Sequence, residues 1–433
     1  MSPIMTGVVG LASLLVLLMF GMPIGFAMLV LGFTGFAYLT SFTGAVNILV
    51  NTPYALISSY DYAVIPLFIF MAALCNSTGL GQGLFRMANA WLGRIPGGLS
   101  IATIGSCAVF GAASASSIAT TATIGTVALP EMKRYNYDPG LSVGCVAAGG
   151  TLGIIIPPSG ILMIYGIIAQ QDIGKLFIAG LLPGILLAVM FLIMIVVRVK
   201  LKPSLAPLGP KTTLKEKVFS ILDSFEMLVV IILAIVGLLV GWFTPTEAGA
   251  VGAFGALIMS LVRRRLTWEA FKSATMETVR TGGMIFAVLI GALVFTSFLA
   301  VTTIPMEVAE WVGDLGWPPM AVMIFILLMY VVMGTFLEEM AMILLTLPIF
   351  FPVVVALGFD PIWFGIIIVV VVIMGMISPP VGITMFVAKG IAPDIPMSTI
   401  YRGVLPFLAI SVVFTALLLA FPQIALWLPG LFG

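Results

Sequence analysis

The fold is decided by the stretch GGTLGIIIPPSG at residues 149–160, where glycines and a proline pair interrupt a long apolar segment. A second interruption, GMISPPVG at residues 375–382, lies equally deep in another apolar segment, and Pro157 recurs there as Pro379, 222 positions later. In a lipid bilayer every backbone N–H and C=O needs a partner, so a broken helix persists only where it lines a cavity inside the protein. Paired broken helices at matching positions of two halves predict the binding site of a transporter.

The composition predicts a polytopic membrane protein that crosses a lipid bilayer several times. The 433 residues are 61% hydrophobic and only 8% charged, with a mean hydropathy of +1.26, whereas soluble domains are about 25% charged. The chain contains no histidine, which excludes imidazole-based acid–base chemistry and imidazole metal sites. The net charge of +1 gives no indication of a nucleic-acid partner. The start lacks a basic region and a cleavage signal, so we expect the first apolar run to be a retained membrane span.

The offset of 222 residues extends well beyond the two proline pairs. It also matches Pro23 with Pro245, Pro96 with Pro318, Pro130 with Pro352, and Asp172-Ile173 with Asp394-Ile395. Proline and glycine positions that agree over most of a chain indicate an internal duplication. We therefore predict repeat one at residues 1–200, a basic cytoplasmic linker at residues 201–222 and repeat two at residues 223–433. The linker carries Lys202, Lys211, Lys215 and Lys217.

Residues 97–130 form an apolar run that is too long for one straight crossing. As a single helix this run would measure about 51 Å, whereas the hydrocarbon core is about 30 Å thick. Its middle, GAASASS at residues 111–117, consists of small residues, and basic residues flank both ends of the run. We therefore predict a re-entrant hairpin with its tip at residues 111–117. A two-helix hairpin that crosses the bilayer completely is the alternative.

The distribution of basic residues predicts how the two repeats are oriented. Several segments of repeat one carry basic residues, namely Arg86, Arg94, Lys133, Arg134, Arg198 and Lys200. The equivalent segments of repeat two carry acidic residues instead, namely Glu307, Glu310, Asp314 and Asp360. Conversely, residues 41–60 have no base and correspond to the basic stretch at residues 263–280. Since basic loops stay on the cytoplasmic side, the predicted fold is an all-α membrane protein with two inverted-topology repeats. Each repeat is expected to contain a re-entrant hairpin and a discontinuous helix.

Two groups of oxygen-bearing residues are candidate cation sites, because hydroxyls and unwound backbone carbonyls suit a hard cation such as sodium. Sodium site one is predicted at Ser114, Ser116, Ser117 and Thr120 of the hairpin tip, with Gly150, Thr151, Gly153 and Pro157 of the broken helix. Sodium site two is predicted at Gly334, Thr335 and Glu338, with Gly375, Ile377, Ser378 and Pro379. The N-termini of the half-helices would suit the carboxylate of a substrate.

Each of these residues also has a purely structural interpretation. Serine and threonine in membrane helices commonly bond to their own backbone or join neighbouring helices. Glu338 and Glu339 stand inside an apolar stretch, where a carboxylate costs about 3 kcal/mol and a functional role is therefore the first interpretation. The alternative is that this pair faces water at the hairpin mouth and caps the second half-helix. Asp172 and Asp394 are interpreted as N-caps, and Cys75, Cys107 and Cys145 as buried hydrophobic residues.

The quoted motifs resemble a known family of membrane proteins. At GMPIG (residues 21–25), PLFI (66–69), GLLPG (180–184), SPPVG (378–382), and residues 111–126 and 149–160, the chain resembles the large membrane subunit of tripartite ATP-independent periplasmic (TRAP) transporters, the DctM type. The resemblance implies sodium-coupled import of a small organic acid across a bacterial inner membrane. It also implies two partners, a small four-helix membrane subunit (DctQ type) and a periplasmic substrate-binding protein (DctP type).

The same resemblance implies an elevator mechanism, in which a transport domain slides against a scaffold. The scaffold helices would lie at residues 1–60 and 223–280, and the transport domain at residues 62–170 and 281–395. The substrate class stays open among C4-dicarboxylates, sialic acids, sugar acids, oxo acids and sulfonates. The family often carries aspartate where this chain has Glu338.

Three other functions compete with this interpretation. A membrane-embedded hydrolase would need a nucleophile with a base, and the serines at the tip have no histidine or nearby lysine. A channel also uses re-entrant hairpins, but its broken helices would line a continuous pore. A stand-alone ion-coupled organic anion transporter of related inverted-repeat fold, working without a binding protein, is the strongest alternative.

Overall fold

The computed structural model describes residues 1–209, 212–314 and 316–432, and within these residues the chain forms helices and loops without strands. The helices are α1 (Pro3–Met19), α2 (Ile24–Leu39), α3 (Phe42–Ser58), η1 (Tyr60–Ala63), α4 (Val64–Ser77), α5 (Leu80–Leu92), α6 (Gly98–Ser114), α7 (Ser117–Arg134), α8 (Pro139–Thr151), η2 (Leu152–Ile154), α9 (Gly160–Ala169), α10 (Ile173–Leu201), η3 (Pro203–Leu205), α11 (Leu214–Leu239), α12 (Pro245–Val262), α13 (Trp268–Thr302), α14 (Ile304–Asp314), α15 (Pro319–Gly334), α16 (Glu339–Ala356), α17 (Pro361–Met376), α18 (Ile383–Ile391), α19 (Met397–Ala420) and α20 (Gln423–Phe432).

By length and composition, six of the described helical segments are suited to cross a membrane, or seven if the bent helix α11 counts as one span. The six are η1 with α4, α10, α12, α13, α16 and α19. Shorter apolar helices include α6, α15 and the helices on either side of each predicted break. The chain is therefore an all-helical, multi-pass protein, as the composition predicts.

Both predicted breaks and the predicted hairpin tip are present. Helix α8 ends at Thr151, passes through η2 and resumes as α9 at Gly160, while α17 ends at Met376 and resumes as α18 at Ile383. The Pro157–Pro158 and Pro379–Pro380 peptide bonds are both cis. Helices α6 and α7 form a hairpin whose tip is Ala115 and Ser116, with Ala115 in the left-handed region at φ 49°. Helices α15 and α16 form a second hairpin with its tip at residues 335–338.

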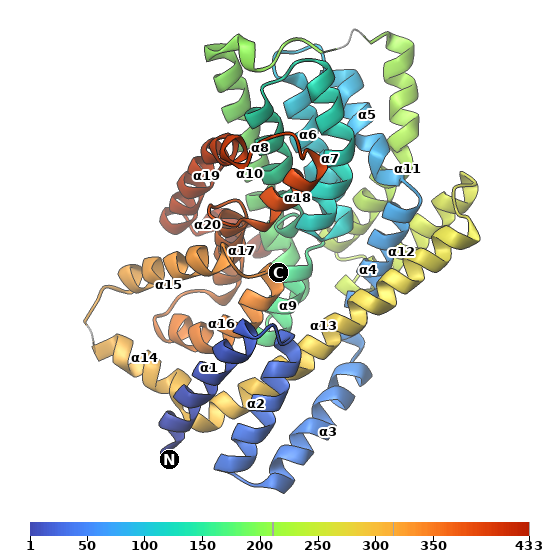
Figure 1. Cartoon of the computed structure of the whole chain (residues 1–433). Helices are drawn as coiled ribbons and strands as arrows, with labels where there is room; N and C mark the ends of the chain where they lie inside the picture. Colours follow the sequence, from blue (N-terminus) through green and yellow to red (C-terminus); the bar gives the residue numbers. More distant parts are fainter. Residues whose placement is uncertain (210–211, 315, 433) are drawn as a thin grey trace.

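The two hairpins and the two broken helices pack crosswise. The first hairpin lies against α8, and its α7 arm also contacts α18, the helix that follows the other break. The second hairpin lies against α17, and its α16 arm contacts α9, which follows the first break. Figure 1 shows α7 beside α18 and α9 beside α16. Helices from the two halves of the sequence therefore build one interlocked body.

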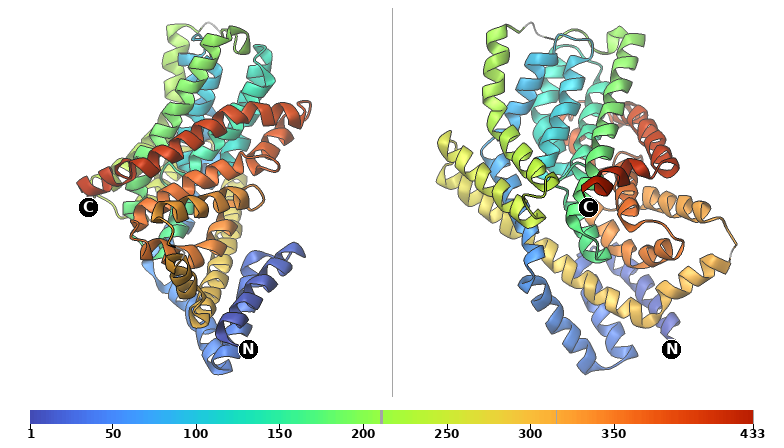
Figure 2. Two further views of the ribbon diagram at one scale, coloured as in Figure 1. Left: turned by 90° about the vertical axis from the view of Figure 1, so that its left-hand side faces the viewer. Right: turned by 180° about the vertical axis from the view of Figure 1, so that it is seen from behind.

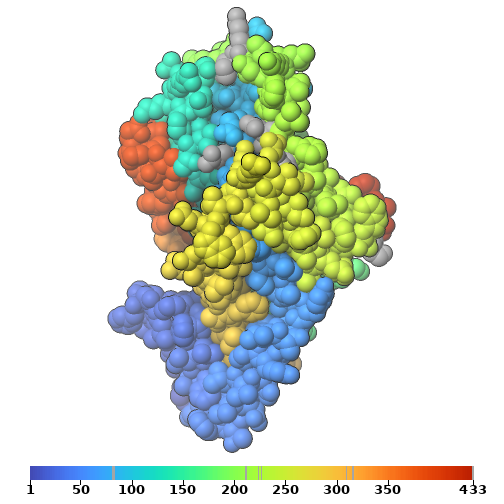
Figure 3. Space-filling model, turned by 90° about the vertical axis from the view of Figure 1, so that its right-hand side faces the viewer, coloured from blue at the N-terminus to red at the C-terminus, as the bar shows by residue number. Residues whose placement is uncertain are grey.

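A second body surrounds the long helix α13. Helix α13 packs on α2 and α4, and α12 packs on α4 as well. Glycines permit the close approach of α2, since a Cβ on Gly291 would lie 2.1 Å from the carbonyl oxygen of Gly25. Helices α1, α2 and α3 gather at one end of the molecule (Figures 1 and 2), and the space-filling view shows them below α11 and α12, with part of α13 between them (Figure 3).

The helix bounds do not all coincide with the bounds of the predicted segments. Helix α11 begins at Leu214, so the segment predicted as a linker up to residue 222 is helical in its last part. Lys211, assigned to that linker, lies outside the described residues. Helix α13 runs unbroken through residue 280, where the scaffold helices were predicted to end. The three cysteines are buried free thiols, as predicted.

Candidate functional site

The tip of the first hairpin is a compact group of hydroxyls. The Ser114 and Thr120 hydroxyl oxygens lie 2.6 Å apart, and the Thr120 hydroxyl donates to the carbonyl oxygen of Ser116 at 2.7 Å. The Ser116 hydroxyl oxygen accepts from the backbone N–H of Ala119 at 3.3 Å and so caps the N-terminus of α7. A hydroxyl that donates to a carbonyl keeps oxygen lone pairs that can face a cation.

The first break in α8 touches this tip through glycines. A Cβ on Gly153 would lie 2.8 Å from the Cα of Gly111, and one on Gly150 would lie 1.9 Å from the hydroxyl oxygen of Thr121. The Thr151 hydroxyl donates to the carbonyl oxygen of Ala148 at 2.7 Å. Only glycine therefore fits at residues 111, 150 and 153 while the hairpin keeps this approach.

The second hairpin meets the second break in the same manner. A Cβ on Gly375 would lie 2.6 Å from the Cα of Gly334. The backbone N–H of Gly382 donates to the carbonyl oxygen of Thr335 at 3.3 Å, which joins tip to break. The Thr335 and Ser378 hydroxyls each donate to a backbone carbonyl of their own helix, at 2.7 Å and 2.6 Å. These bonds to the backbone of the same helix correspond to the structural interpretation of serine and threonine given above.

The two neighbouring glutamates have different surroundings. Glu338 is exposed and is the N-cap of α16, because its carboxylate accepts from the backbone N–H groups of Met340 and Ala341 at 3.1 Å and 3.0 Å. The capping alternative thus describes Glu338. Glu339 is only 3% exposed, and its carboxylate accepts a hydrogen bond from the Ser117 hydroxyl at 2.7 Å. The sequence analysis predicts Glu338 as the ligand, whereas the buried carboxylate between the two hairpin tips belongs to Glu339.

A cavity of about 420 Å³ opens where the two tips face α4 and α13. The first tip contributes Ser114 and Ser116, the second contributes Glu338 and Glu339, and α13 contributes Glu277 and Thr281. Lysine and arginine are absent from the described residues that line it. The cavity therefore combines hydroxyls with three carboxylates and has a volume suited to a small molecule.

The structure brings part of each predicted sodium site to a hairpin–break junction: Gly150 and Gly153 meet the first hairpin, and Gly375 meets Gly334 of the second. Gly150, Thr151, Gly153 and Pro157 are buried, whereas Ser114 and Ser116 are half-buried. At the second junction Gly334, Thr335, Gly375, Ile377 and Ser378 are buried, and Pro379 is half-buried. Both junctions offer hydroxyl and carbonyl oxygens, which fit the chemistry of a hard cation. Ser117 differs from the other members because its hydroxyl points to Glu339 rather than into its own junction. Ligation by these residues remains a prediction.

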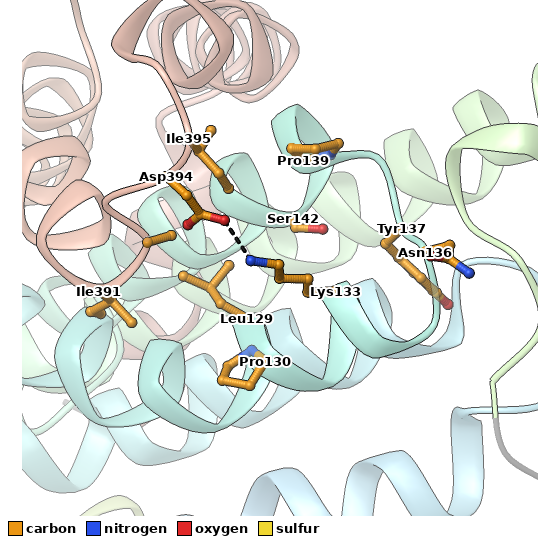
Figure 4. Close-up of a pocket in the computed structure, with 11 residues that line it drawn as sticks. Leu129, Pro130, Lys133, Asn136, Tyr137, Pro139, Ser142, Ile391, Asp394 and Ile395 are labelled. Atoms are coloured by element: carbon orange, nitrogen blue, oxygen red, sulfur yellow. Dashed lines mark hydrogen bonds and ion pairs between the residues drawn. The ribbon is translucent and has the colours of Figure 1, made fainter.

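One predicted helix cap is wrong and one is confirmed. Asp172 caps α10 by accepting from the backbone N–H of Lys175. Asp394 does not cap α19, which begins at Met397, and its carboxylate instead pairs with the Lys133 ammonium at 2.5 Å. Figure 4 shows this pair at the rim of a second cavity of about 550 Å³, between the end of α7 and the loop that precedes α19. The hydrogen bond from Lys133 holds the pKa of Asp394 below its ordinary value of 3.8.

Comparison with known proteins identifies the family. Residues 11–424 match the family described as tripartite ATP-independent periplasmic transporter, DctM component. The C4-dicarboxylate TRAP transporter large permease protein DctM of Pseudomonas aeruginosa is 36% identical, over 86% of this chain and 87% of the relative. The sialic acid TRAP transporter large permease protein SiaM of Vibrio cholerae is 32% identical, over 96% of each chain.

The fold itself has a counterpart among solved structures. The YdaH transporter of Alcanivorax borkumensis superposes with a TM-score of 0.63 at 14% identity, over 88% of this chain and 89% of that one. At this identity the likeness concerns the fold alone. The family match and the two relatives are transport proteins, not enzymes, and the described helices agree with several membrane crossings. The chain therefore belongs to the TRAP transporter family as a DctM-type large permease, a multi-pass protein of the bacterial inner membrane.

Proposed function

We propose that this chain couples the entry of sodium to the uptake of a small organic acid, a carboxylate or sulfonate, by an elevator movement. The substrate would bind in the 420 Å³ cavity between the two hairpin tips and helices α4 and α13. Sodium ions would bind at the two hairpin–break junctions. The crosswise body of hairpins and broken helices would form the transport domain, and α2, α12 and α13 would belong to the scaffold.

The composition of the cavity lining is the observation that carries the proposal. Glu277, Glu338 and Glu339 line the cavity, and its described lining residues supply no basic side chain to receive an acid. An anion that entered alone would meet no positive charge in this lining, and any ionised glutamate would repel it. Cations bound at the adjacent oxygen clusters would offset that repulsion. Binding of the acid would then require sodium, which is the condition for coupled transport.

The packing pattern supports a twofold relation between the two repeats, which we propose to be inverted in the membrane. With an offset of 222 residues, α2 corresponds to α12, and α4 corresponds to the second half of α13. The contact of α2 with α13 then has a counterpart in the contact of α12 with α4. The contact of α7 with α18 has a counterpart in that of α16 with α9. Such exchanged pairs are expected when two halves are related by a twofold axis in the membrane plane.

The relatives guide the proposal for substrate and partners. The names of the two relatives specify C4-dicarboxylates and sialic acid, which share an acidic group. By membership of the same family, this chain would work with a small membrane subunit of the DctQ type and a periplasmic binding protein of the DctP type. The binding protein would select the acid and deliver it to the cavity.

Sodium-driven uptake into proteoliposomes tests the proposal. Ser116→Ala removes the cap of α7 at the first junction, and Thr335→Ala removes a hydroxyl at the second. We expect both variants to need at least several-fold more sodium for half-maximal uptake. Thr34→Ala is a matched control, because the Thr34 hydroxyl also donates to a backbone carbonyl at 2.7 Å, but in α2. Unchanged sodium affinity in both site variants would remove the site assignment.

The stand-alone anion transporter remains the competing function, since its fold would also contain inverted repeats. Full uptake by the reconstituted membrane subunits without any soluble binding protein would establish that alternative. A channel is tested by counterflow, in which labelled substrate accumulates against an excess of unlabelled substrate. Accumulation requires alternating access, whereas a continuous pore would not produce it.

A further inference from the structure

The two hairpin tips are joined directly by a hydrogen bond between side chains. The Ser117 hydroxyl, at the first turn of α7, donates to the Glu339 carboxylate, at the first turn of α16, over 2.7 Å. Both side chains are buried, with exposed fractions of 0% and 3%. The two residues are 222 positions apart, which is also the offset of the two proline pairs. The bond therefore joins equivalent positions of the two halves.

The surrounding contacts give this bond a particular place in the site. Each tip also contacts its own broken helix, through Gly111 against Gly153 in one half and Thr335 with Gly382 in the other. The Glu338 carboxylate, in contrast, accepts from backbone N–H groups of its own helix. A hydrogen bond between two buried side chains is stronger than one in water and orients both partners. A shift of one tip is therefore transmitted to the other through Ser117 and Glu339.

We propose that Ser117 and Glu339 couple the two junctions, so that a cation bound at one tip favours binding of a cation at the other. This inference rests on the proposed sodium sites. Glu339 acts as a positioning residue, because its carboxylate holds Ser117 and with it the first turn of α7, which carries Ser116 and Thr120. A bound cation orders one tip, and the shared bond places the second tip in its binding geometry. The second ion then binds with less cost of ordering.

Thermal unfolding of the purified protein in detergent, measured against sodium chloride with choline chloride as the ionic-strength control, tests the coupling without substrate. A ligand that binds only the folded state raises its stability as the ligand concentration rises. We expect a steep, cooperative rise for the natural chain. Ser117→Ala and Glu339→Ala should each make the rise shallow and increase the half-stabilising sodium concentration by about fivefold or more. The double variant should resemble either single variant, because both remove the same bond.

Two further variants distinguish the loss of this hydrogen bond from the loss of the Glu339 charge and from the loss of a buried hydroxyl in general. Glu339→Gln keeps a carbonyl oxygen that can accept from Ser117, so it should retain most of the steepness. Ser411→Ala removes another fully buried serine hydroxyl, on α19, and should leave the sodium response unchanged.

The possible outcomes distinguish this inference from the proposed function. Absence of any sodium-specific stabilisation of the natural chain would contradict the sodium sites themselves. Cooperative stabilisation that survives in Ser117→Ala would overturn the coupling alone. Equal losses in Glu339→Gln and Glu339→Ala would assign the effect to charge and would also overturn it.

Discussion

The contact between Gly111 and Gly153 makes a quantitative prediction for the variant Gly111→Ala. The new Cβ would lie 2.4 Å from the Cα of Gly153, about 1 Å short of the 3.4 Å at which ordinary contact begins. The obstacle is backbone, so it cannot rotate away, and such overpacking costs about 1–3 kcal/mol. Alanine in the interior of a helix stabilises the folded protein by about 0.5–1 kcal/mol relative to glycine, which offsets part of this cost. We therefore expect a net loss of up to about 2.5 kcal/mol and a displaced first tip.

The same helix supplies the control, because a Cβ on Gly105 would have no atom within 4 Å. Gly105→Ala should gain about 0.5–1 kcal/mol from helix propensity alone. Unfolding in mixed micelles measures the stability of both variants. Sodium-driven uptake measures how the change at the junction affects the sodium requirement. Gly111→Ala should also need more sodium for half-maximal uptake, whereas Gly105→Ala should not. Equal stability and equal sodium requirement in the two variants would refute the claim that glycine is needed where hairpin and broken helix meet.

Two further predictions concern hydrogen bonds between distant parts of the chain. Because Lys133 holds the pKa of Asp394 below 3.8, the stability that this pair contributes is present at neutral pH and lost as the pH falls through that lowered pKa. The difference in thermal midpoint between the natural chain and Lys133→Met should therefore shrink between pH 7 and pH 3, and a constant difference would contradict this. The Tyr165 hydroxyl donates to the carbonyl oxygen of Pro361 at 2.5 Å and joins α9 to the start of α17. Tyr165→Phe should lower the unfolding free energy by about 1–3 kcal/mol, whereas Tyr54→Phe, at a 74% exposed position, should not.

The features that the sequence predicted correctly are those with a local chemical cause. The breaks at residues 149–160 and 375–382 contain proline and glycine. Proline removes a backbone hydrogen bond of a helix, and glycine lowers helix stability. The tip at Ala115 and Ser116 follows from a run of small residues in a segment too long for one crossing. The offset of 222 residues was visible because prolines and glycines serve the same backbone purpose in both halves.

The features that the sequence could not provide depend on contacts between distant residues. Asp394 precedes a helix as Asp172 does, yet its partner is Lys133, 261 positions away, and no local pattern specifies that pairing. The choice between Glu338 and Glu339 is decided by the direction of the first turn of α16, which places one outward and the other toward Ser117. The offset itself was the available signal, since it pairs Ser117 with Glu339.

The crosswise packing constrains how any elevator movement could proceed. Helix α9 lies against α16 and α18 against α7, so neither hairpin can move far without carrying the helix that follows the other break. Interiors packed in this way transmit displacement rather than absorb it. The cavity lies at the boundary between this body and helices α4 and α13, where Glu277 faces the two tips. A substrate bound there would touch both bodies at once. Cations at the tips would therefore change the charge at the surface along which the two bodies slide. Ion binding would in this way control whether the transport domain can move against the scaffold.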